Sequence, residues 1–441
     1  KLAQRRDAPL PRGLVGVCAV AASIATYGFN SFWDLAQCEN VCTVLAFASL
    51  VSACRIRRAA VAEIVSGLFG GAAVVVKPPV VWFVIAAAIA VAYRALDESM
   101  PEATPRQRAT RVGIAWARFG VATFSLPLLM VGYFALHGAA GELRFWLVDV
   151  NKYYLANERG VSTFAELVVR SRNMFSYFDP YASIALALVA IGVLSAALRS
   201  DRPTLRRYLA VVGLFFAAYA SVAMQLKFFI YHFLMLVGPA TLLAGVVFLD
   251  LEAWLARARS EPPPDVAPGK RALALAGALF LLFPLARTSN ELWWPEVRET
   301  WRWVGGTTSR EEFTRLFTVP VLSFSFHDCE LTGLWLREHS NPEDSVAVRG
   351  FEPQIYAVAR RRYHHRFFWT NFITDARRSL RHAEWLREEE IATREDPPRF
   401  AVTIMDSAEV VGTDWYAPLG YVERARFGDF RVLEHVPSAA K

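Results

Sequence analysis

The sequence has little cysteine, and its cysteines follow no spacing that would hold a metal ion or build a disulfide framework. Only five of the 441 residues are cysteine. Cys18, Cys38, Cys42 and Cys54 lie in or beside apolar runs, and Cys329 stands alone. The sequence therefore predicts neither a structural zinc site nor a disulfide-stabilised scaffold.

Other signatures are missing as well. The adjacent His364 and His365 lack the i, i+4 spacing of a helical metal site. No nucleophile elbow marks a hydrolase, no cleavable signal peptide is visible, and no inverted repeat of the transporter kind is evident. The chain begins at Lys1 rather than at methionine, so we expect an N-terminally truncated piece of a longer protein.

The distribution of basic residues argues against nucleic acid as a partner. The net charge is +7, but 54% of the residues are hydrophobic, which is too apolar for an ordinary soluble enzyme. The arginines gather in short connections between apolar runs, as in membrane proteins with a fixed orientation. We therefore expect a polytopic protein of the lipid bilayer.

Nine apolar segments are predicted to be transmembrane helices. They cover about residues 14–32, 40–54, 61–76, 80–96, 112–136, 181–199, 208–224, 233–249 and 272–288. Every second connection is rich in arginine, and such connections face the cytoplasm. The predicted fold is therefore an α-helical polytopic transmembrane domain over residues 1–288, in the cytoplasmic (inner) membrane, followed by an extracytoplasmic α/β domain over residues 289–441.

The stretch 225–232 lies between two apolar runs on the predicted outer face. It holds Gln225, Lys227, Tyr231 and His232. This composition fits a site for the phosphate of a lipid-borne ligand. It equally fits an interfacial anchor, in which Lys227 snorkels and Tyr231 joins an aromatic belt.

Two short apolar segments, 40–54 and 61–76, bring more charges to the same depth. Because both are short for a full span, their outer ends are expected to face a protein-lined cavity. Asp34, Glu39 and Lys77 would then lie beside the 225–232 stretch. Such charges are costly near lipid unless they pair or bind a ligand. The plain alternative is that Asp34 and Glu39 are solvated loop charges.

The longest outer connection, residues 137–180, is rich in aromatic residues, which argues against disorder. Its amphipathic part predicts a helix on the membrane surface. Asp149, Lys152 and Tyr153 within it are candidates for lining a substrate cleft, and a plain interfacial helix is an equal alternative.

The composition changes after residue 288, where alternating patterns predict a small α/β domain. Helices are expected at 329–339, 353–361 and 375–394, and strands at 345–350, 400–404, 421–424 and 430–435. The basic run 360–366 is either a solvated face or a site for phosphate or an acidic glycan.

Three local motifs and their order resemble a known family. Gln37-Cys38-Glu39-Asn40 opens a helix, Gly70-Gly71 to Lys77-Pro78 closes one, and Gln225 to His232 opens another. The layout resembles the C-type fold (GT-C) of polyprenyl-phosphate-sugar-dependent glycosyltransferases, in particular the bacterial relatives of protein O-mannosyltransferases. The resemblance covers nearly the whole chain, although each motif is short.

The resemblance implies transfer of a sugar from an undecaprenyl-phosphate donor to a glycan or protein acceptor outside the membrane. Asp34 or Glu39 would be the catalytic general base, and Lys77, Lys227 and His232 would bind the donor phosphate. Gln225 and Tyr231 would line the substrate cleft. The family's first outer loop, which carries its principal acid, is not found here. The resemblance specifies no cofactor with certainty, although a divalent metal is compatible with it.

Two alternatives stay open at the level of sequence. One is a transporter or flippase that moves lipid-linked glycans without chemistry. The other is a polysaccharide polymerase or ligase, which uses lipid-linked sugars but normally lacks a folded C-terminal domain.

Overall fold

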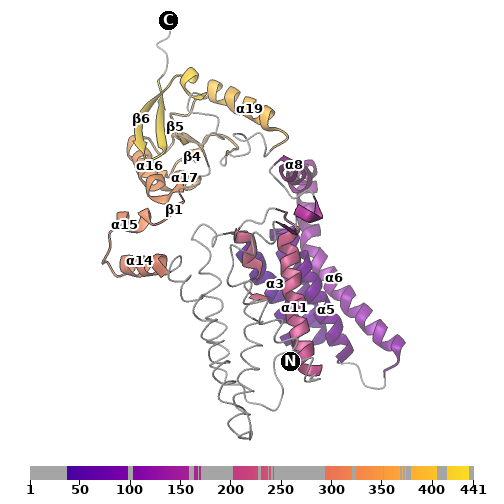
Figure 1. Cartoon of the computed structure of the whole chain (residues 1–441). Helices are drawn as coiled ribbons and strands as arrows, with labels where there is room; N and C mark the ends of the chain where they lie inside the picture. The colour runs from indigo at the N-terminus through magenta and orange to yellow at the C-terminus, as the bar shows by residue number, and fades with distance from the viewer. Residues whose placement is uncertain are drawn as a thin grey trace. The chain divides into compact units, whose positions relative to one another are not determined.

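The structure is a computed structural model that describes part of the chain. The chain divides into two compact units, Lys1–Ala140 with Val161–Pro295, and Gly141–Gly160 with Glu296–Lys441. The colours of Figure 1 follow the chain through both units. The described residues are 37–97, 103–157, 163–166, 168–169, 202–226, 230–236, 238–239, 242, 294–319, 324–350, 352–367, 370, 373, 379–404 and 415–436.

The first unit is built from long apolar helices that run side by side (Figure 1). They are α3 (Cys38–Arg55), α4 (Ala59–Val76), α5 (Val81–Asp97), α6 (Pro105–Leu136) and α11 (Arg202–Ala223), with the short 3-10 helices η1 (Pro78–Val80) and η3 (Ile230–Leu236). Among the described residues, four helical stretches are long and apolar enough to cross a membrane: α3, α4, η1 with α5, and α6. The chain thus has the composition of a membrane protein.

These helices confirm four of the nine predicted spans. A fifth, 208–224, coincides with the apolar part of α11, Tyr208–Ala223. Segments 14–32, 181–199 and 272–288 lie outside the described residues, and only the first residues of 233–249 are described, in η3. A total of nine spans is therefore not confirmed.

The expectation that two spans are unusually short is wrong. Helices α3 and α4 each have 18 residues, which corresponds to a length of about 27 Å. This length is close to the hydrocarbon thickness of a bilayer. Helix α3 is longer than predicted because Cys38 and Arg55 belong to its end turns, and α4 is longer because it begins at Ala59.

Glycines allow α4 and α6 to pack closely. A Cβ atom at Gly67 would lie 2.4 Å from the carbonyl oxygen of Phe119, and one at Gly71 would lie 2.3 Å from that of Thr123. The two glycines are four residues apart and so share one face of α4. Small residues at this spacing let membrane helices approach backbone to backbone.

Polar side chains complete the helix ends and contacts of this unit. The Arg94 guanidinium donates hydrogen bonds to the carbonyl oxygens of Ala53, at 3.1 Å, and of Arg57, at 2.7 Å. It thereby satisfies a carbonyl group that the last turn of α3 leaves open, at Ala53, and one in the connection to α4, at Arg57. The Ser49 hydroxyl donates to the Ser66 carbonyl oxygen at 2.7 Å, and this contact joins α3 to α4.

The second unit contains a five-stranded sheet with the order β4-β3-β5-β7-β6. Strand β3 is parallel to β4 and β5, and β7 is antiparallel to β5 and β6. The strands are β3 (Ser345–Arg349), β4 (Arg362–Tyr363), β5 (Phe400–Ile404), β6 (Tyr421–Phe427) and β7 (Phe430–His435). The predicted strands are confirmed. Within this sheet the sequence missed β4, which has only two residues and is too short for alternation to reveal.

Helices flank this sheet and precede it in the chain. They are α14 (Trp294–Val304), α15 (Arg310–Arg315), α16 (Phe326–His339), α17 (Gln354–Ala359) and α19 (His382–Glu395), and the two-residue strands β1 (Thr318–Val319) and β2 (Phe324–Ser325) form a separate pair. Trp335 of α16 packs against Phe400 of β5, with ring centroids 5.6 Å apart. The α/β class of this unit is as predicted.

Part of the long connection after α6 also belongs to the second unit. It forms α7 (Ala140–Arg144), the π-helix η2 (Phe145–Asp149) and α8 (Val150–Asn157). Phe145 is buried in a cluster with Trp385 of α19, and the Trp146 ring stacks on Trp385 with centroids 5.5 Å apart. The aromatic residues that predicted a membrane-surface helix are therefore in contact with the sheet domain.

Candidate functional site

Three residues that are far apart in the sequence meet in the first unit, with Glu39 at the centre. Glu39 is in the first turn of α3, Lys77 is the residue that ends α4, and His232 is in η3. Helices α3 and α4 are joined by a short connection and are therefore antiparallel. The start of α3 consequently lies beside the end of α4, and this arrangement pairs residues 39 and 77.

The contacts around the Glu39 carboxylate use both of its oxygens. The Lys77 ammonium pairs with Oε1, and His232 Nε2 lies 3.6 Å from the same oxygen. The Cys38 thiol donates a hydrogen bond to Oε2 at 3.3 Å. Glu39 is completely buried, and the Lys77 side chain is 18% exposed.

Aromatic and helix-end effects further favour the ion pair. The Lys77 ammonium lies 5.8 Å from the centre of the Tyr231 ring, within the range of a cation–π interaction. Glu39 sits at a helix N-terminus and Lys77 at a helix C-terminus. The macrodipoles of both helices therefore stabilise the charge that each end carries.

The charge balance of this cluster determines what it is able to bind. One carboxylate is opposed by one ammonium and by one imidazole, so the cluster is neutral with neutral His232 and carries one positive charge when His232 is protonated. Of the three residues that set this charge balance, Lys77 is partly exposed, whereas Glu39 and His232 are buried. A ligand would therefore approach the cation and not the carboxylate.

The other predicted site residues have different surroundings. Gln225, in the turn that follows α11, donates its amide hydrogen to the carbonyl oxygen of Ser221 in that helix at 3.2 Å. Asp149 lies in η2, and Lys152 and Tyr153 lie in α8, so these three belong to the second unit and not to the unit that contains Glu39. Asp34 and Lys227 lie outside the described residues.

Sequence reasoning missed one member of the cluster, Cys38. Cysteine spacing gave no signal, and the thiol interacts with Glu39 only because the two residues are adjacent at the start of α3. Within the described ranges, no group of three or more His, Cys, Asp or Glu side chains is placed to hold a metal ion.

The basic run 360–366 has structural partners. Arg361 donates hydrogen bonds to the Ser340 carbonyl oxygen at 2.6 Å and to the Arg337 carbonyl oxygen at 3.0 Å, and so completes the end of α16. Arg366 pairs with Glu388 at 2.7 Å. These contacts favour a structural role for the run over the anion site.

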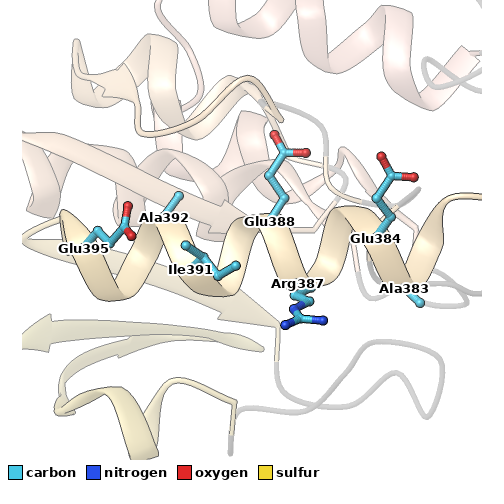
Figure 2. Close-up of a pocket in the computed structure, with 7 residues that line it drawn as sticks. All are labelled: Ala383, Glu384, Arg387, Glu388, Ile391, Ala392 and Glu395. Atoms are coloured by element: carbon cyan, nitrogen blue, oxygen red, sulfur yellow. The ribbon is translucent and has the colours of Figure 1, made fainter.

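A shallow hollow runs along α19, and Figure 2 labels its lining residues. In that view the Glu384 and Glu388 side chains extend to one side of the helix and the Arg387 side chain to the other. All lining residues come from this one helix: Ala383, Glu384, Arg387, Glu388, Ile391, Ala392 and Glu395. Ligand sites normally combine polar groups that converge from several elements, so the hollow is not assigned a role.

The fold and the buried ion cluster define a helical membrane protein with a small α/β domain. No protein-family model matches the sequence, and no curated protein matches it. Among solved structures, the chain is similar to the archaeal oligosaccharyltransferase AglB from Archaeoglobus fulgidus in complex with an inhibitory peptide and a dolichol-phosphate. The identity is 14% and the TM-score 0.39, with 98% of this chain and 63% of that chain covered. This chain thus spans less than two thirds of that protein, and a likeness at this level assigns neither fold nor activity.

Proposed function

We propose that the chain is a membrane glycosyltransferase that takes a sugar from a polyprenyl-phosphate donor. The observation that carries this proposal is the meeting of Glu39, Lys77 and His232 at the ends of apolar helices. Ionisable side chains within apolar helices are costly and therefore usually functional. Phosphate on a lipid is a ligand that reaches this depth and needs a cation.

In the proposed mechanism, Lys77 contacts the donor phosphate and His232 adds charge when it is protonated. As the bond between the sugar and the phosphate breaks, negative charge accumulates on the phosphate oxygens, and fixed cations in a partly dry site stabilise that charge. Glu39 holds the Lys77 ammonium in place, and the Tyr231 ring lies on the same cation. Lys227 is the further candidate for this role from the sequence.

The buried position of Glu39 bears on which acid serves as general base. A base must come within hydrogen-bond distance of the acceptor hydroxyl. Glu39 is fully buried and has both carboxylate oxygens in contact with Lys77 and Cys38. We therefore assign Glu39 a positioning role and keep Asp34 as the candidate base within this sequence.

The donor contact is tested by lipid binding, which does not require the acceptor to be known. The probes are undecaprenyl phosphate and undecaprenol, each titrated into the purified chain in nanodiscs. The phosphate lipid is expected to bind at least about tenfold more tightly, because charge-assisted hydrogen bonds to the phosphate are added. Lys77→Ala should abolish this preference, whereas Arg106→Ala, which removes an exposed cation elsewhere on the first unit, should keep it.

Equal binding of the two lipids by the wild-type chain would overturn the donor assignment. A preference that survives in Lys77→Ala would move the phosphate site to other residues. If the chain binds the phosphate lipid but no extended form of it transfers a sugar, the alternative of a transporter or flippase of lipid-linked glycans is favoured.

A further inference from the structure

The carboxyl ends of β3 and β5 form a switch point in the sheet of the second unit. The two strands are parallel neighbours. After β3 the chain passes through α17 to β4, on one side of this pair of strands. After β5 it continues to η7 (Ala417–Leu419) and to β6, which lies on the other side of the pair, beyond β7. Ligands of open α/β sheets bind outside the carboxyl ends of strands at such a point.

A buried arginine lies at this strand end. The register pairs Arg349 of β3 with Thr403 of β5, and so both side chains leave the same face of the sheet. The same face carries Ala347 and Ala401, which pack against Tyr416. Arg349 is 1% exposed.

The Arg349 guanidinium is held in one orientation. Its Nη2 donates a hydrogen bond to Oε2 of Glu389 in α19 at 2.9 Å. The Trp415 ring lies 3.6 Å from the guanidinium carbon, and the Tyr416 ring lies 5.4 Å from it. These contacts fix the directions of the remaining N–H groups.

Several buried polar atoms on this face of the sheet have hydrogen-bonding capacity that the protein does not use. Within the described part of the chain, Nε and Nη1 of Arg349, Oγ1 of Thr403 and Oη of Tyr416 are buried and lack a hydrogen-bond partner. Buried groups of this kind are rare because losing water without a new partner costs free energy. Arg349 and Thr403 lie together at the switch point and Tyr416 packs on the same face of the sheet, so a polar ligand bound here would complete their hydrogen bonds.

The charge balance selects the chemistry of that ligand. Arg349 is opposed by Glu389, and the buried Glu352 lies close to the strand end, since a Cβ atom at Gly350 would come within 2.1 Å of its Oε2. The site therefore has no surplus positive charge for an anion. A neutral hydroxyl group accepts from the guanidinium and both donates to and accepts from Thr403 and Tyr416.

We propose that the carboxyl ends of β3 and β5 bind the hydroxyl groups of a neutral sugar. This second site rests on the proposed function only in expecting the ligand to be part of a glycan that the enzyme handles. Its residues belong to the second unit, whereas the Glu39 cluster belongs to the first.

The test measures binding of free mannose, galactose, glucose and arabinose by saturation-transfer NMR on the full chain in a sugar-free detergent. At least one sugar should bind saturably. Thr403→Val and Tyr416→Phe should each weaken that binding about fivefold, since each removes a hydroxyl contact. Tyr421→Phe is the matched control, because that hydroxyl is already bonded to the Pro398 carbonyl oxygen at 2.7 Å.

The inference is overturned if no sugar binds saturably, which would mean that ordered water alone completes these groups. It is also overturned if Thr403→Val and Tyr416→Phe bind sugar as tightly as the wild type and the Tyr421→Phe control do. Lys77→Ala separates this outcome from the proposed function. Sugar binding should persist in Lys77→Ala even though the preference for undecaprenyl phosphate is lost. Loss of sugar binding in that variant would instead place the sugar at the membrane cluster.

Discussion

In the part of the chain that the structure describes, each unit contains an ion pair with a buried partner, and the two pairs differ in which partner has all of its hydrogen-bonding groups occupied. In the first unit the carboxylate of Glu39 has contacts on both oxygens, and the cation Lys77 is partly exposed. In the second unit the cation Arg349 is buried, and part of its hydrogen-bonding capacity is unused. The first arrangement leaves a cation partly accessible to a ligand. The second leaves hydrogen-bond donors buried inside the domain.

This difference matters because burying an ion pair does not by itself stabilise a protein. Removing charges from water often costs as much as their attraction returns. Ion pairs that persist in such positions are therefore candidates for function. Substitutions of their members separate the effect on stability from the effect on binding in each unit.

The largest effect on stability is expected from Glu389→Ala. This change leaves the Arg349 guanidinium buried and without its carboxylate, so the free energy of unfolding of the second unit should fall by about 3–5 kcal/mol. Urea unfolding of the full chain, followed by tryptophan fluorescence, measures the loss. Glu388→Ala on the same helix is the control, because its partner Arg366 is exposed and such pairs contribute about 0–1 kcal/mol. Equal losses in both variants would show that Arg349 does not depend on Glu389.

A smaller loss is expected from Glu39→Gln in the first unit. Lys77 is partly exposed and is able to turn towards water, so the cost should be about 1–3 kcal/mol, below that of Glu389→Ala. The double variant Glu39→Gln/Lys77→Met should regain most of this stability, because no buried charge is then left unpaired. It should not regain undecaprenyl phosphate binding. Recovery of binding in the double variant would contradict the role of Lys77.

The sequence predicted the members of the Glu39 cluster better than it predicted their arrangement. Arginine-rich connections alternate along the chain, and this alternation placed Glu39, Lys77 and His232 at one depth without any structure. What it did not supply was the pairing of Glu39 with Lys77, which depends on where α3 begins and α4 ends. Helix ends are the least certain part of any prediction from periodicity.

The interactions of the second unit were harder to predict because they join distant residues. Arg349 and Glu389 are 40 residues apart and meet only after β3 and α19 pack. Phe145 and Trp146 read as part of a membrane-surface helix because amphipathic patterns do not distinguish lipid from a protein partner. Trp385, their actual partner, lies more than two hundred residues further along the chain.

Helix contact in the first unit provides a test that does not involve charge. Gly67→Ala would place a methyl group against the Phe119 carbonyl oxygen, so α4 and α6 must separate, at a cost of about 1–3 kcal/mol. Gly113→Ala on α6 is the control, since a Cβ atom there meets nothing within 4 Å. The thermal unfolding midpoint in detergent should fall for the first variant only. A fall of equal size in both would mean that the close crossing of α4 and α6 contributes nothing specific.

The smallest effect is a pH dependence that should be confined to the second unit. Burial lowers the pKa values of His364 and His365 below the usual value of about 6.5. The two rings lie 3.9 Å apart, and they also face Asp396, Glu388 and Glu389, which favour the charged form but do not reverse the shift. A histidine whose folded pKa is lowered binds fewer protons in the folded state than in the unfolded state. Its stabilising contribution is therefore complete above the unfolded pKa and declines as the pH falls through about 6.5 towards the folded pKa.

Urea unfolding at pH 7.5, 6.5 and 5.5 should show decreasing stability of the second unit, and the double variant His364→Asn/His365→Gln should show a flatter dependence. An unchanged slope in the double variant would show that the acid sensitivity in this pH range does not come from His364 and His365.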